Sequence, residues 1–232
     1  MSIALTPAFS EIRSTFSLSV TEHGGSVSEV FENEDLLIMR AILPQSDDVK
    51  PSDPVNSGVA LRCSGRSLEI HPYVFRQVCS NGVIMAQSVA SCQLDRIESW
   101  QHENEESDTL LQLSQVVAGC ATGDAFSRSV DQFRNAGSRN LASMDLMLSM
   151  MAVMHGHTAL IEMIARDFMR AEDQSAYGLL NAVTATARET TDPETKWTLE
   201  KIGGSIPARI SIGSADSAQN HTATGPSLVP VA

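Results

Sequence analysis

The chain lacks the segments that would direct it into or across a membrane. It has no run of about 18 apolar residues, roughly the length that a helix needs to span a bilayer. The N-terminus, Met1–Pro7, has no basic segment followed by an apolar stretch, so we predict no secretion signal. The cysteines form no Cys-x-x-Cys pair, which is typical of reduced thiols: Cys63, Cys79, Cys92 and Cys120. These absences predict a cytoplasmic protein that does not contact a membrane.

The sequence also lacks the short motifs that many enzymes carry. It has no glycine-rich phosphate loop and no Gly-x-Ser-x-Gly elbow; Gly24-Gly25 and Gly203-Gly204 fit a turn or a helix end. Cys79 is a candidate nucleophile with His71 nearby in the sequence, but no other residue around it completes a catalytic motif. Residue types that bind zinc occur at no spacing that matches a known ligand pair: Cys63, Cys79, Cys92, His155 and His157. We therefore predict no enzymatic activity, no metal and no cofactor.

Aromatic residues are scarce, at 5% of the chain, and so is positive charge, with a formal net charge of −12. A protein with this net charge repels a polyanion on average. The charge is segregated, however: residues 22–48 and 103–108 are acidic, whereas residues 62–76 and 128–139 are modestly basic. We therefore expect any site for a negatively charged partner in one of the two basic segments.

The apolar pattern predicts strands in the first half of the chain. The predicted strands cover residues 36–43, 59–63, 68–70 and 73–78. The first is apolar on both alternating faces, which is typical of a strand that is covered on both sides. Ser64-Gly65 predicts a hairpin, and Asn81-Gly82 predicts another turn. Residues 83–97 fit either a strand or the start of a helix.

Apolar side chains at spacings of three and four predict helices in the second half. The predicted helices cover residues 110–120, 124–136, 141–154, 161–168 and 177–187. A last helix begins at Asp192-Pro193 and is expected to stop at Gly203-Gly204. We predict one α+β domain over residues 1–210, with an antiparallel sheet in the N-terminal half backed by a helical C-terminal half. Residues 211–232 are predicted to be a disordered tail.

Three segments resemble a known family. They are Ser57–Gly82 with its Cys-Ser-Asn-Gly sequence, His157–Ile161, and Tyr177–Gly204 with its Asn-Ala-Val-Thr sequence. Together they resemble the phage- and plasmid-associated proteins grouped as domain of unknown function 932. The resemblance implies a protein of bacterial mobile elements. The family's order of strands and then helices is similar to that of single-strand annealing proteins of the Rad-fifty-two type, which assemble into rings.

The basic segments hold the candidate nucleic-acid-binding residues. A non-specific site for a single strand needs cations along a groove and rings on which bases stack. The candidates are Arg62, Arg66, Tyr73, Arg76, Arg128, Arg134 and Arg139. On a strand, Tyr73 and Phe75 share one face and Arg76 takes the other, so this strand alone cannot line a groove. The alternative is that both rings lie in the core and the arginines pair with acidic residues.

The leading functional prediction is a non-enzymatic, mobile-element-type protein that binds single-stranded DNA. It would act as a homo-oligomer in annealing or recombination, and methionines over residues 144–154 belong either to the core or to a subunit contact. The alternative is an acidic phage or plasmid regulatory factor that binds another protein and has no nucleic-acid binding of its own. A third reading, an enzyme, requires a cleft that holds titratable groups with perturbed pKa values.

Overall fold

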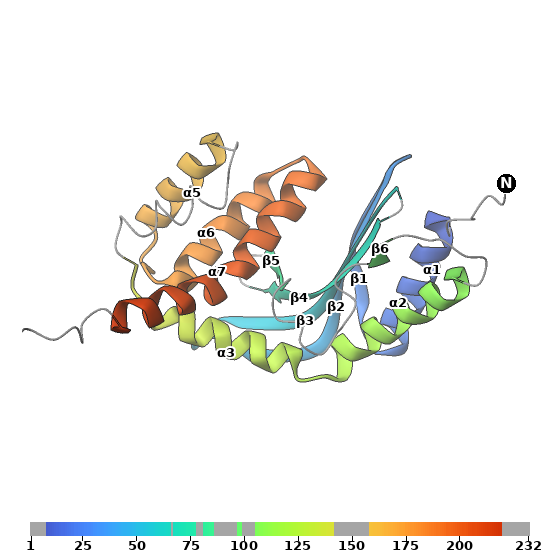
Figure 1. Ribbon diagram of the computed structural model, residues 1–232, viewed down its shortest axis with the longest axis horizontal. Helices are drawn as coiled ribbons and strands as arrows, with labels where there is room; N and C mark the ends of the chain where they lie inside the picture. The colour runs from blue at the N-terminus through green and yellow to red at the C-terminus, as the bar shows by residue number, and fades with distance from the viewer. Residues whose placement is uncertain are drawn as a thin grey trace, which may run out of the picture.

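The computed structural model describes residues 8–65, 67–77, 81–85, 97–98, 105–141 and 158–219. Its sheet lies in the N-terminal half and most of its helices lie in the C-terminal half, so the predicted α+β class is confirmed. In Figure 1, the sheet is curved. The helices α1 (Phe9–Glu22) and α2 (Glu105–Thr122) lie on one side of it, and α6 (Ala176–Glu189) and α7 (Pro193–Gln219) lie on the other.

The sheet is an antiparallel meander in the order β1-β2-β3-β4-β5, and β6 pairs briefly with β4. Its strands are β1 (Ser26–Glu32), β2 (Leu36–Asp48), β3 (Pro54–Ser64), β4 (Ser67–Arg76), β5 (Asn81–Ile84) and β6 (Ile97–Glu98). The predicted hairpin at Ser64-Gly65 is confirmed, because Ser64 pairs with Ser67 and Gly65 has a φ of 55° that suits glycine. The segments predicted as two strands, 68–70 and 73–78, form the continuous strand β4.

Strand β2 contributes to a core on each face of the sheet. Leu37 and Met39 pack in a cluster with α1 and α2, whereas Leu36 and Ile38 pack with Trp197 of α7. Side chains alternate across a strand, so a strand that is apolar at successive positions is buried on both faces. The predicted burial of this strand on both sides is confirmed.

Helix α1 has no counterpart in the prediction from sequence. Ile12, Phe16 and Val20 recur every four residues and are fully buried in the cluster with β2 and β3. Serine and threonine fill much of the rest of this helix, which weakens its apolar signal. The Ser19 hydroxyl donates to Ser114 Oγ at 3.0 Å and links α1 to α2.

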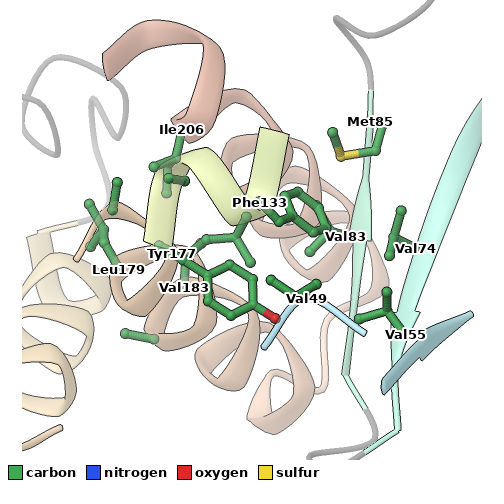
Figure 2. Close-up of a cluster of buried hydrophobic side chains, with 14 of the residues drawn as sticks. Val49, Val55, Val74, Val83, Met85, Phe133, Tyr177, Leu179, Val183 and Ile206 are labelled. Carbon is green, nitrogen blue, oxygen red and sulfur yellow. The ribbon is translucent and has the colours of Figure 1, made fainter. Parts of the chain in front are cut away.

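The largest core lies between the sheet and the helices α3 (Ala125–Gly137), α5 (Thr158–Arg170), α6 and α7. Figure 2 shows Val74 and Val83 of the sheet on one side of this cluster and Phe133, Tyr177 and Val183 of the helices on the other. The helices predicted over residues 110–120, 124–136, 161–168 and 177–187 are confirmed. The helix predicted over residues 141–154 lies, beyond its first residue, outside the described residues.

Helix α7 begins as predicted but does not end as predicted. Asp192 accepts hydrogen bonds from the Thr195 amide and hydroxyl, as an N-cap does. The predicted stop at Gly203-Gly204 is wrong, because α7 continues through both glycines and Pro207 to Gln219. The tail predicted from residue 211 therefore begins within a helix, and residues 220–232 lie outside the described residues. Within the described residues, no helix is long and apolar enough to cross a membrane.

Candidate ligand-binding pocket

The predicted nucleic-acid-binding arginines lie in different parts of the fold. Arg62 pairs with Glu69 near the turn of the β3–β4 hairpin, whereas Arg76 pairs with Val55 at its far end. Arg128 and Arg134 belong to α3, far from this hairpin turn in the sequence. The sheet register alone therefore separates Arg62 from Arg76 by most of the length of a strand.

Several of these arginines bind carboxylates. Arg62 donates to both oxygens of Glu194 in α7, from Nε at 3.0 Å and from Nη2 at 2.7 Å. Its Nη1 also lies 3.3 Å from Glu69. Arg76 Nε donates to Asp53 at 2.6 Å. The positive charges of Arg62 and Arg76 are therefore paired with carboxylates of the protein, which is the alternative given in the sequence analysis.

The remaining candidates do not complete a groove. Arg134 donates to Asp47 at 2.8 Å. Arg128 is exposed on α3, Arg139 follows α3, and Arg66 lies outside the described residues. Tyr73 is 5% exposed, which fits a buried residue better than a surface on which a base stacks. Binding of single-stranded DNA through these residues stays a prediction.

A cavity of about 230 Å³ lies instead where the sheet faces α6 and α7. From the strands it is lined by Ser28, Glu29, Tyr73, Phe75, Asn81 and Gly82. From the helices it is lined by Thr184, Arg188, Lys196 and Glu200. The cavity thus combines two aromatic rings, hydrogen-bonding groups and charges of both signs. Polar groups that converge beside aromatic side chains are the part of a pocket that orients a ligand.

The amide of Asn81 is hydrogen-bonded to α6. Its Nδ2 donates to Thr184 Oγ1 at 2.8 Å, and the Thr184 hydroxyl lies 3.1 Å from the Leu180 carbonyl, to which it donates. The hydroxyl thus both accepts from Asn81 and donates within its own helix. Asn81 Oδ1 is buried and has no hydrogen-bond donor among the residues that the structure describes.

The Tyr73 ring occupies the space beside Gly82. A Cβ on Gly82 would lie 1.9 Å from Tyr73 Oη, so glycine is required for this close approach. The hairpin predicted at Asn81-Gly82 is present, because β4 pairs with β5 in antiparallel orientation, but both residues begin β5 and do not form its turn. The Tyr73 hydroxyl has no hydrogen bond within the described part of the chain. Burial, and then the nearby charge of Glu200, raise the pKa of Tyr73 well above its ordinary value.

Arg40 of β2 and Glu200 of α7 form a buried ion pair beside the cavity, with both side chains 2% exposed. Arg40 Nε and Nη2 donate to the same atom, Glu200 Oε2, at 2.9 and 2.7 Å. Glu200 Oε1 has no such partner among the described residues. Burial raises the pKa of Glu200 to about 7, and the Arg40 charge opposes this rise.

Further ion pairs hold α7 against the sheet. Lys196 Nζ lies 2.7 Å from both oxygens of Glu29, which is also 3.3 Å from Arg40. The other pairs between α7 and the sheet are Glu194 with Arg62 and Lys201 with Glu69. The cavity is therefore bounded by a helix that is anchored at several points along its length.

Of the residues that line the cavity, the sequence analysis predicts only Tyr73 as a binding residue. A signal was present, because the segments that carry the family resemblance contain Asn81, Thr184 and Glu200. These segments are far apart in the sequence, yet in the fold they line one cavity. No pattern in the sequence placed Arg40 beside them.

Comparison with models of protein families, with curated proteins and with solved structures found no match. The resemblance to the phage- and plasmid-associated family therefore stays a prediction.

The described residues contain no group of three His, Cys, Asp or Glu side chains that could hold a metal ion. Of the ligand types considered from the sequence, Cys79, Cys92, His155 and His157 lie outside those residues.

Proposed function

We propose that the protein binds a small polar molecule in the cavity between the sheet and the helices α6 and α7. The observation that carries this proposal is the cavity of about 230 Å³, whose lining combines aromatic rings with polar and charged side chains from both the sheet and the helices.

The Tyr73 hydroxyl supports a ligand. Tyr73 lines the cavity, and its hydroxyl has no hydrogen bond within the described part of the chain. The hydroxyl is not among the buried polar atoms that lack a partner, so it keeps some accessible surface. A polar group of a molecule in the cavity can therefore bind this hydroxyl, which both donates and accepts hydrogen bonds.

The test uses the two tyrosines of the chain as a matched pair. Binding of amino acids, polyamines, sugars, nucleosides and nucleotides is screened by thermal shift and measured by calorimetry. Tyr73→Phe removes a hydroxyl that faces the cavity and lacks a protein partner, so affinity falls about three- to tenfold while stability is kept. Tyr177→Phe removes a hydroxyl that donates to Asp53 at 2.9 Å outside the cavity, so stability falls while affinity is kept.

Two results would refute this function. One is that no compound of the panel binds. The other is that the compounds that bind do so equally well to Tyr73→Phe and to the unmodified protein.

Single-stranded DNA binding by an oligomer is the second candidate. It is supported by the family resemblance and by Arg188, which lines the cavity and keeps 48% of its side chain exposed. Retention of a labelled oligonucleotide at low salt, lost steeply at moderate salt, is the expected result, because phosphate contacts dominate such affinity. Absence of retention at every salt concentration favours the acidic protein-binding factor instead.

A further inference from the structure

Three of the four charged side chains that line the cavity, among the described residues, are paired at short distance within the protein. Both oxygens of Glu29 lie 2.7 Å from Lys196 Nζ. Glu200 accepts two hydrogen bonds from Arg40, at 2.9 and 2.7 Å. These charges offset one another, so they attract an ion of neither sign strongly.

Arg188 of α6 is the fourth charged side chain. It keeps 48% of its side chain exposed, and its ion pair with Glu189 spans 3.9 Å, which is longer than a hydrogen bond. A guanidinium has five N–H donors in a planar fork, so an anion can bind Arg188 beside its other contacts. Carboxylates and phosphates fit this fork with two hydrogen bonds. The lining therefore favours a ligand with one anionic group, bound at Arg188.

The Tyr73 hydroxyl lies away from Arg188 along the cavity. A Cβ on Gly82 would meet this hydroxyl, and the neighbouring Asn81 binds Thr184 at 2.8 Å. The hydroxyl is thus placed near the level of Thr184 on α6. Arg188 follows Thr184 by one helical turn, about 6 Å along the helix axis. The cavity therefore has a cationic end at Arg188 and a different end at Tyr73.

The Tyr73 end suits a neutral polar group. Burial, and then the negative charge of Glu200, raise the pKa of Tyr73 well above its ordinary value, so the hydroxyl keeps its proton at neutral pH. The same negative charge disfavours an anion at this end. A hydroxyl group of a ligand carries no charge and can either donate to Tyr73 Oη or accept from it.

The middle of the cavity suits one flat ring. Tyr73 and Phe75 lie on the same face of β4, and both line the cavity. Phe75 is only partly buried, so its ring is accessible to an aromatic ligand, and such ring pairs add to the binding free energy. The volume of about 230 Å³ is below the range of about 300–1,000 Å³ typical of drug-sized ligands.

Resting on the ligand-binding function above, we propose that the ligand is a small aromatic anion: one ring with an anionic group at one end and a neutral hydroxyl at the other. The anionic group binds Arg188, the ring lies beside Phe75, and the hydroxyl binds Tyr73 Oη. A carboxylate and a phosphate ester share this chemistry. The experiment below distinguishes them.

The probes are 4-hydroxybenzoate, its neutral methyl ester and 4-hydroxyphenyl phosphate, which join the panel above and are measured by calorimetry. The better-binding anion should exceed the ester in affinity by at least about tenfold, because an anion makes charge-assisted hydrogen bonds with a guanidinium. Whether this anion is the carboxylate or the phosphate identifies the group. Equal affinity for the ester overturns the inference. So does equal affinity for trans-4-hydroxycyclohexanecarboxylate, which has the end groups of the benzoate on a ring that is not flat.

Two arginine variants locate the anionic group. Arg188→Gln should lower the affinity for the anion to that for the ester. Arg166→Gln is the matched control, because Arg166 lies on α5, keeps 54% of its side chain exposed and does not line the cavity. This control should keep the full affinity. A preference for the anion that survives in Arg188→Gln overturns the inference.

Tyr73→Phe locates the hydroxyl end. The variant should bind the hydroxylated anion about three- to tenfold more weakly, while its affinity for benzoate or phenyl phosphate, which lack the hydroxyl, stays the same. Equal changes for the two kinds of ligand overturn the inference. Binding of none of the anions, together with Tyr73-dependent binding of another compound of the panel, overturns it and leaves the proposed function intact. Binding of no compound refutes both.

Discussion

Asn81 Nδ2 lies 2.8 Å from Thr184 Oγ1, and this buried hydrogen bond joins the first residue of β5 to the middle of α6. The two residues are 103 positions apart in the chain. The bond holds two walls of the cavity together.

Replacing Thr184 by valine tests the structural part of this bond. The change keeps the shape of the side chain and leaves Asn81 Nδ2 without an acceptor, so the free energy of unfolding falls by about 1–3 kcal/mol. Thr186→Val is the control, because Thr186 is equally buried and its hydroxyl donates only to the Ala182 carbonyl of its own helix. Urea unfolding measures the free energy of unfolding of both variants. An equal decrease in the two variants would show that the hydrogen bond between Asn81 and Thr184 does not contribute to stability.

Gly204 tests the close packing of α7 on β5. A Cβ at this position would lie 2.0 Å from the Ile84 carbonyl oxygen, which is backbone and cannot turn aside. We expect Gly204→Ala to lower the free energy of unfolding by about 1–3 kcal/mol, despite the gain in helix propensity. At Gly203 the nearest atom is the Thr184 methyl at 3.0 Å, so a movement of only a few tenths of an ångström makes room for a Cβ. Gly203→Ala should therefore lower the stability much less than Gly204→Ala in thermal unfolding, and a similar loss in both variants would contradict this explanation.

These glycines show where prediction from sequence reached its limit. A glycine that ends a helix and a glycine that lets a helix approach a strand have the same local sequence. Gly203-Gly204 therefore predicts a stop and Asn81-Gly82 a turn, whereas in the fold Gly204 packs against the backbone of Ile84 in β5 and Gly82 packs against Tyr73 of β4. Strands and amphipathic helices were predicted well because their signal lies within a few residues.

The site depends on contacts that sequence does not encode locally. Arg40 and Glu200 are 160 positions apart, and nothing near either residue indicates its partner. The basic segment at residues 62–76 predicted free arginines because the carboxylates that bind them come from elsewhere, such as Glu194 of α7 for Arg62. Charge counted along a chain does not show which charges are paired in the fold.

The buried pair of Arg40 and Glu200 predicts an effect that depends on pH. A carboxyl whose pKa is raised by folding makes the protein less stable as the pH rises through that pKa, which is about 7 for Glu200. Arg40→Met removes the charge that opposes the rise, so the pKa increases further and the loss of stability extends to higher pH. The destabilisation relative to the unmodified protein should therefore grow from pH 6 to pH 9 in urea unfolding.

The control for this variant is Arg134→Met. Arg134 and its partner Asp47 are 41% and 45% exposed, so their pair contributes about 0–1 kcal/mol. The free energy of unfolding of Arg134→Met should therefore fall only slightly, and by the same amount at pH 6 and at pH 9. If Arg40→Met behaved in the same way, the buried pair would not control the protonation of Glu200.

Glu69 predicts the opposite dependence at acid pH. A hydrogen bond with His71, and then the contacts of Lys201, lower the pKa of Glu69 to about 2. A carboxyl whose pKa is lowered by folding stabilises the protein above the unfolded value of about 4.5, and this stability is lost as the pH falls toward 2. Glu69→Gln lacks this contribution, so between pH 5 and pH 2.5 its free energy of unfolding should fall less than that of the unmodified protein, by roughly 1–3 kcal/mol. Glu34→Gln, at an exposed position, controls for the loss of one negative charge. If the free energy of unfolding of Glu69→Gln fell with pH as steeply as that of the unmodified protein, the contacts with His71 and Lys201 would not stabilise the charged form of Glu69.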